Sequence, residues 1–153
     1  ANSQNVQIAR TWERYRPMLY LAVDSGMRPQ EYLVVQKKNL SDKGIQVDRA
    51  LDASGTKLTT TKTSAGRRFI ELSQPTIEIV RHYAEHHAAP NDHDLIFPTS
   101  NGKWQSTNNW RRRGFAAACI EAGLVEEIET KRGVERVPKY KPYDLRHFLL
   151  QCS

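Results

Sequence analysis

The spacing of apolar side chains changes along the sequence from a helical rhythm to an alternating one and then back. Between residues 6 and 25 apolar positions recur every three or four residues, which predicts a helix. Pro17 lies inside this stretch and predicts two helical pieces, because proline suits the first turn of a helix better than its interior. Gly26 predicts the end of the second piece, and a short helix is expected over 29–35.

The middle of the chain has the alternating pattern of β-strands. Ile45 and Val47 alternate with polar neighbours, and residues 58–61 are rich in threonine. Apolar residues within 69–72 follow a Ser-Ala-Gly turn at 64–66. These features predict a small antiparallel sheet with a hairpin at the turn.

The remainder returns mostly to helices. The predicted elements are a helix from Pro75, a short buried segment at 95–97, a helix from Ser106 or Thr107 to Ala122, an exposed hairpin within 125–141 and a final helix after Pro142. The expected fold class is therefore α+β, a mostly helical domain with a small antiparallel β-sheet.

Composition narrows the class of protein without naming a function. The chain has 153 residues, 39% of them hydrophobic and 26% charged, which suits one globular domain. It has no apolar run of about 18 residues and no visible leader, so neither a membrane span nor a signal peptide is expected. Cys119 and Cys152 do not make a disulfide framework or a zinc site, which favours a reducing, intracellular setting.

The charge balance favours an anionic partner. Lysine and arginine number 23 against 17 acidic residues, a net charge of +6. Such a domain is a candidate for nucleic-acid binding, although ordinary domains are also mildly basic.

The first candidate site combines Arg28 with Glu31, directly after Gly26. An arginine at the start of a helix is well placed to hold a phosphate. Glu31 lies three residues further on and can orient Arg28 or cap the helix. A capping ion pair without a function is the alternative.

The second candidate is Lys62, next to the predicted turn and followed by Arg67 and Arg68. A lysine at a hairpin tip can enter a groove or donate a proton to a leaving group. The alternative is a solvated edge hairpin, on which lysine prevents edge pairing.

The third candidate is the start of the final helix. Tyr143, Arg146 and His147 lie at spacings of three and four residues, so their side chains share one helical face and can converge on an anion. A surface-charged amphipathic helix explains the same residues.

Together these segments resemble one known family, the tyrosine recombinases or phage integrases. Residues 20–31 resemble its first arginine box, and residues 61–72 resemble its lysine-bearing β-hairpin. Residues 95–124 resemble the segment before its second arginine box, and residues 143–147 resemble that box. The four segments stand in the family's order and cover nearly the whole chain.

The resemblance implies site-specific cutting and rejoining of DNA through a 3′-phosphotyrosyl link, without a metal or energy cofactor. Arg28 and Arg146 would clamp the non-bridging phosphate oxygens, and Lys62 would protonate the leaving 5′-oxygen. Glu31 would support Arg28, and His147 would support the phosphate or Arg146. We expect the three cations Arg28, Lys62 and Arg146 to converge on one concave face. Further DNA contacts are expected from four basic residues, Arg67, Arg68, Arg111 and Arg112.

The resemblance also implies double-stranded DNA as the partner and a tetramer of recombinase protomers when the protein is intact. The expected location is cytoplasmic and nucleoid-associated, in a bacterium or phage system.

Two departures from the family shape the expectations. Tyr143 stands where the family usually has histidine; it can hydrogen-bond a phosphate but is a poor general base near neutral pH. The resemblance implies that the family's nucleophilic tyrosine would lie beyond Ser153 and that its N-terminal DNA-clamping domain would lie outside residues 1–153. We therefore expect residues 1–153 to be a catalytic domain that is incomplete at its C-terminus and inactive by itself.

Two other classes of function stay open. One is a non-catalytic module that binds double-stranded DNA, and the other is a basic domain with a protein or RNA partner. The basic run at 111–113 fits a DNA-contacting helix and a solvated helical face equally well. His82, His86 and His87 fit a solvated helix end better than a metal site.

Overall fold

The computed structural model describes residues 3–60, 67–121 and 123–142, and within these ranges the side chains from residue 13 onwards, apart from those of residues 118 and 121. Its first element is one continuous helix, α1 (Ser3–Ser25), which contains Pro17. The prediction of two pieces divided at Pro17 is therefore wrong. Proline removes one backbone hydrogen bond, but Met18 and Leu21 are fully buried directly after it, and this packing outweighs the local preference.

The segment after α1 turns back into the core. It forms the short helix α2 (Pro29–Tyr32) and a 3₁₀ turn, η1 (Lys37–Asn39). Helix α2 is shorter than the expected 29–35, because residues 33–35 leave the helix while remaining buried. Gln36 then pairs with Leu95 in an isolated bridge, so this segment is held by a partner far along the sequence.

The four strands between residues 44 and 71 form two separate antiparallel ladders. Strand β1 (Gly44–Val47) pairs with β4 (Arg68–Glu71), and β2 (Arg49–Leu51) pairs with β3 (Leu58–Thr60). The strands on either side of the expected hairpin thus have different partners, in place of one continuous sheet. The turn at 64–66 lies outside the described residues.

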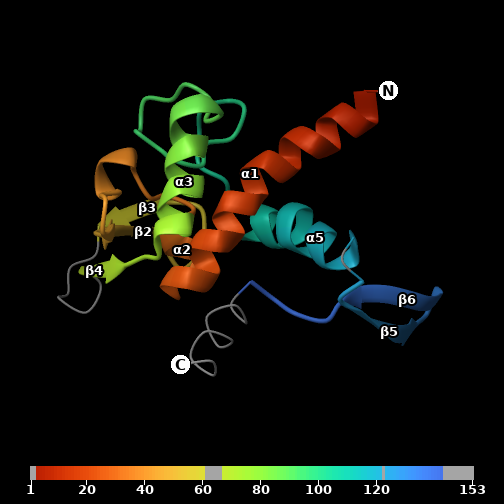
Figure 1. Cartoon of the computed structure of the whole chain (residues 1–153). Coiled ribbons are helices and arrows are strands. Elements are labelled where there is room, and N and C mark those ends of the chain that lie inside the picture. Colours follow the sequence, from red (N-terminus) through yellow and green to blue (C-terminus); the bar gives the residue numbers. More distant parts are fainter. Residues whose placement is uncertain (1–2, 61–66, 122, 143–153) are drawn as a thin grey trace.

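Helix α3 (Gln74–His86) confirms the helix predicted from Pro75 and packs against α1 (Figure 1). Its apolar face, with Ile77 and Val80, is fully buried. The segment 95–97 is also buried as predicted, and the ring of Phe97 stacks on Tyr83 at a centroid distance of 5.8 Å.

The next helical stretch contains an unexpected π-helical segment. Helix α4 (Thr107–Asn109) continues into η2 (Trp110–Phe115), which is π-helical, and then into α5 (Ala116–Glu121). The predicted N-cap is confirmed, since Ser106 Oγ accepts a hydrogen bond from the Asn109 backbone N–H at 3.1 Å. Gly114 lies against the Trp110 ring, where a Cβ atom would approach two ring carbons to 2.4 Å.

The predicted exposed hairpin is confirmed as β5 (Val125–Thr130) paired with β6 (Gly133–Pro138). It extends from the end of α5, away from the other strands (Figure 1). The α+β fold class is therefore confirmed, and Cys119 is buried in the core as expected. None of the described helices is long and apolar enough to cross a membrane.

Candidate functional site

Arg28 lies at the N-cap of α2 with an exposed side chain. The chain reaches it through Gly26, whose φ of +68° lies in the left-handed region that glycine adopts without strain. Met27 is buried beside it, which anchors the backbone. Arg28 itself has extended φ and ψ angles of −75° and 151°, and its N–H donates to Glu31 Oε1 at 2.9 Å. The first candidate site is thus a rigid turn that presents an arginine to solvent.

Glu31 is buried and paired with Arg68, the first residue of β4. Arg68 Nη1 lies 2.8 Å from Glu31 Oε2, and Arg68 Nη2 lies 2.9 Å from Glu31 Oε1. This bidentate pair joins α2 to β4, the strand that follows the expected Lys62 turn. Glu31 therefore supports Arg28 through the backbone N–H, while the charge of the carboxylate is paired with Arg68.

Opposing effects act on the pKa of Glu31. Burial by itself raises the pKa, since it disfavours the charged form. The hydrogen bonds from Arg68 and the Arg28 backbone, together with both guanidinium charges, outweigh burial and hold the pKa below its usual value. The Glu31 hydrogen bond in turn raises the pKa of Arg68.

A lowered carboxyl pKa makes stability depend on pH. The stabilisation from Glu31 is fully present above the unfolded-state pKa, about 4.3, and is lost as the pH falls through the lower pKa of the folded state. We expect Glu31→Gln to cost about 1–3 kcal/mol of unfolding free energy at neutral pH and to flatten the acid-side loss. Urea denaturation between about pH 7 and pH 3 measures this. Glu78→Gln, at an exposed position on α3, is the control. If unfolding free energy depends on pH in the same way for wild type and Glu31→Gln, the prediction for Glu31 is wrong.

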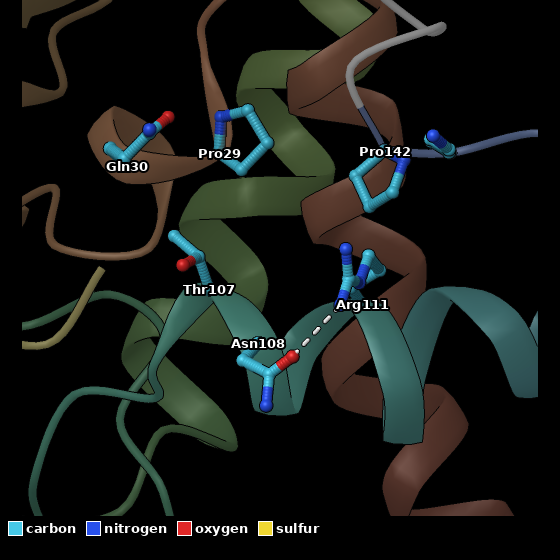
Figure 2. Close-up of a pocket in the computed structure, with 7 residues that line it drawn as sticks. Pro29, Gln30, Thr107, Asn108, Arg111 and Pro142 are labelled. Carbon is cyan, nitrogen blue, oxygen red and sulfur yellow. Dashed lines mark hydrogen bonds between the residues drawn. The ribbon is translucent and has the colours of Figure 1, made fainter. Parts of the chain in front are cut away.

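The start of α2, the start of α4 and the end of the described chain meet around an open cavity of about 310 Å³. Figure 2 shows prolines from two of these segments facing the polar residues of the third. Arg111 Nη2 donates to Asn108 Oδ1 at 3.0 Å, which orients the guanidinium along the wall. The lining residues are Pro29, Gln30, Thr107, Asn108, Arg111, Lys141 and Pro142. Two of these are cations, so the cavity suits an anionic ligand.

The structure places the predicted site residues in two groups. Those that it describes are Arg28, Glu31, Arg67, Arg68, Arg111 and Arg112. Apart from Glu31 and the half-buried Arg68, these residues are exposed. Lys62, Tyr143, Arg146 and His147 lie outside the described residues, and their expected convergence with Arg28 stays a prediction.

Several solved structures share this fold, whereas no family model and no curated protein sequence matches the chain. The Tn1549 transposon integrase, solved with transposon right-end DNA, matches with a TM-score of 0.68 at 18% identity, over 90% of this chain and 45% of that chain. The chain has the fold of this integrase and of the two recombinases described next. XerA recombinase matches with a TM-score of 0.64 at 14% identity, over 99% of this chain and 48% of that one.

A third recombinase, XerH bound to a palindromic difH substrate after cleavage, matches with a TM-score of 0.63 at 21% identity, over 94% of this chain and 36% of XerH. The resemblance to tyrosine recombinases is thus confirmed at the level of the fold. The chain spans about half the length of the Tn1549 and XerA structures and less of XerH.

Within this recombinase fold, two features of the site were missed by the sequence analysis. One is the pairing of Arg68 with Glu31, which are 37 residues apart. The other is the hydrogen bond from Trp110 Nε1 to the Tyr32 hydroxyl at 2.7 Å, which fixes η2 against α2. The sequence carries no local signal for either contact, since each joins segments that are distant in the chain.

His82, His86 and His87 lie together at the C-terminal end of α3. The ring centroids of His82 and His86 are 4.7 Å apart, and those of His82 and His87 are 5.3 Å apart. Within the part of the chain that the structure describes, no group of three or more histidine, cysteine or carboxylate side chains is arranged to hold a metal ion.

Proposed function

We propose that this chain is the phosphate-binding part of a tyrosine recombinase, which cuts and rejoins double-stranded DNA at specific sites through a 3′-phosphotyrosyl link. The single observation that carries the proposal is the cavity lined in part by Pro29 and Gln30, the two residues that follow Arg28. Lys141 and Pro142, which directly precede the predicted second arginine box, line this cavity together with Pro29 and Gln30 of the first. Residues 29–30 and 141–142, more than a hundred residues apart in sequence, therefore line the same cavity, which supports the proposal that the two boxes act together.

The proposed chemistry follows from the charge that develops on a phosphodiester under attack. Arg28 and Arg146 hold the non-bridging oxygens by bidentate hydrogen bonds, and Lys62 protonates the leaving 5′-oxygen. Tyr143 donates a hydrogen bond to the phosphate, and His147 supports the clamp from the next helical turn. The proposal includes no metal or energy cofactor, because the phosphotyrosyl link conserves the energy of the broken bond.

We propose that Arg67, Arg111 and Arg112 contact the DNA backbone on either side of the clamp. All three residues are exposed, and Arg111 lines the cavity. Lysine and arginine contacts to phosphate position a protein on the duplex without reading its sequence. The intact recombinase would act on DNA as a tetramer of protomers.

We also propose that the nucleophile is none of the six tyrosines in this sequence. Tyr15, Tyr32 and Tyr83 are buried, and burial raises the pKa of both Tyr32 and Tyr83. Tyr20 and Tyr140 are exposed, and each lies beside a cation at the surface. Arg16 Cζ lies 5.5 Å from the centroid of the Tyr20 ring, and Lys139 Nζ lies 5.8 Å from the centroid of the Tyr140 ring. The sixth, Tyr143, lies outside the described residues; the helix expected there would put it on the same face as Arg146, where it would meet the side of the phosphate.

Binding to a short labelled DNA duplex tests the proposed function. We expect a Kd of roughly 10⁻⁴ to 10⁻⁶ M at physiological salt, with log K falling linearly as log salt rises. Replacing both Arg111 and Arg112 with alanine is expected to reduce the magnitude of the salt slope by about 2, since two phosphate contacts are lost. Fluorescence anisotropy over a salt series measures both quantities.

The control removes the same charge from a different place. Arg132 and Arg136 are exposed on the β5–β6 hairpin, and their double alanine variant is expected to change the slope much less. Binding that is insensitive to salt would refute the proposal. Tighter binding to RNA than to duplex DNA would instead favour an RNA-binding domain.

A further inference from the structure

We infer that Arg68 is a positioning residue: it neutralises Glu31 and so leaves the Arg28 side chain available for the DNA phosphate. The inference rests on the proposed function and gives Arg68 a role different from the direct DNA contact that its place beside Arg67 suggests. It also connects two of the sequence motifs through one buried carboxylate.

The geometry of the Glu31 carboxylate is the first support. Its Oε1 atom accepts from both the Arg28 backbone N–H, at 2.9 Å, and Arg68 Nη2, also at 2.9 Å. Its Oε2 atom accepts from Arg68 Nη1 at 2.8 Å. A bidentate pair fixes orientation as well as distance, so Arg68 determines where Oε1 meets the Arg28 turn.

Burial is the second support. The Glu31 side chain is 6% exposed and that of Arg68 is 31% exposed, so the pair is shielded on the carboxylate side. A buried carboxylate that loses its partner costs several kcal/mol unless another cation replaces it. The guanidinium charge of Arg28 already acts on Glu31 and lowers its pKa. Without Arg68, we expect Arg28 to turn inward and pair with Glu31.

The strand register is the third support. Arg68 lies opposite Val47 in the β1–β4 ladder, and Val47 is buried. The ladder therefore holds the Arg68 backbone in place, while the side chain reaches α2. Arg67, one residue earlier, is exposed and provides a matched arginine whose side chain has a different environment.

A rescue experiment on duplex binding separates this role from a direct contact. Arg68→Gln is expected to weaken duplex binding about tenfold, because Arg28 would pair with Glu31 and lose its charge-assisted contact to the phosphate. Adding Glu31→Gln to Arg68→Gln removes the carboxylate that captures Arg28, so binding is expected to return to near the wild-type value. Arg68→Lys keeps the charge without the bidentate geometry and is expected to weaken binding less than Arg68→Gln. If Arg68→Gln does not fold, Arg68→Lys replaces it in the binding measurement.

A double-mutant cycle supplies the comparison. In an Arg28→Ala background, Arg68→Gln is expected to cause little further loss, whereas Arg67→Gln is expected to cause the same loss with or without Arg28. Equal losses from Arg68→Gln in both backgrounds, without rescue by Glu31→Gln, would overturn the inference and show that Arg68 contacts DNA directly. Thermal denaturation of each variant identifies any loss that comes from unfolding.

A measurement without DNA distinguishes failure of the inference from failure of the proposed function. The Arg28 Nε–H signal in ¹⁵N NMR spectra is expected to show slower exchange with water in Arg68→Gln, and to recover in the double variant with Glu31→Gln. An unchanged Arg28 signal in Arg68→Gln refutes the inference, whatever the protein binds. Absence of salt-dependent duplex binding by the wild-type chain refutes the proposed function alone.

Discussion

Replacing Trp110 with alanine is expected to lower the free energy of unfolding by about 3–5 kcal/mol. Trp110 is fully buried, and its ring lies 4.9 Å from that of Tyr15 and 6.2 Å from that of Tyr32, measured between centroids. Alanine would leave a cavity at the junction of α1, α2 and η2. The variant would also lose the Trp110 Nε1–H that donates to the buried Tyr32 hydroxyl. A buried hydroxyl without that partner lowers the free energy of unfolding further.

Urea denaturation monitored by far-UV circular dichroism measures this loss. Trp104→Ala is the matched control, because Trp104 is only partly buried and its Nε1 atom donates to the Thr56 carbonyl at an exposed site. A similar loss from both variants would contradict the central role of Trp110. Because η2 carries Arg111 to the cavity, we also expect Trp110→Ala to weaken DNA binding even where the protein stays folded.

Incubation of the 153-residue chain with a nicked suicide duplex is expected to give no covalent protein–DNA adduct. The arginines and the lysine of the proposed site stabilise charge and supply a proton, but an adduct needs a nucleophile in line with the leaving oxygen. The described tyrosines are either buried or outside the residues that line the cavity. A denaturing gel, with a tyrosine recombinase on its own cleavage site as the positive control, shows whether an adduct forms.

The informative variant in this experiment is Tyr143→Phe. An adduct that forms with the wild-type chain and disappears with Tyr143→Phe would identify that residue as the nucleophile and refute our assignment. An adduct that persists in the variant would point to Tyr20 or Tyr140, the exposed tyrosines among the described residues.

The sequence determined those parts of the protein whose signals are local. The helix from Pro75, the Ser106 cap and the exposed hairpin are all present as predicted. Each depends on backbone hydrogen bonds and turn preferences that act over a few residues, so a short window of sequence contains the information. The spacing of Arg28 and Glu31 likewise predicted a local contact, which the structure realises through the Arg28 backbone.

Only the tertiary structure decided the features that depend on distant partners. Helix α1 continues through Pro17 because the core buries the residues beyond it, and β3 and β4 separate because β2 and β1 pair with them. The pairing of Arg68 with Glu31 and the meeting of residues 29–30 with residues 141–142 at one cavity have the same origin. Their free energy comes from burial and from charges brought together across the fold, and neither leaves a periodic signal in the sequence around it.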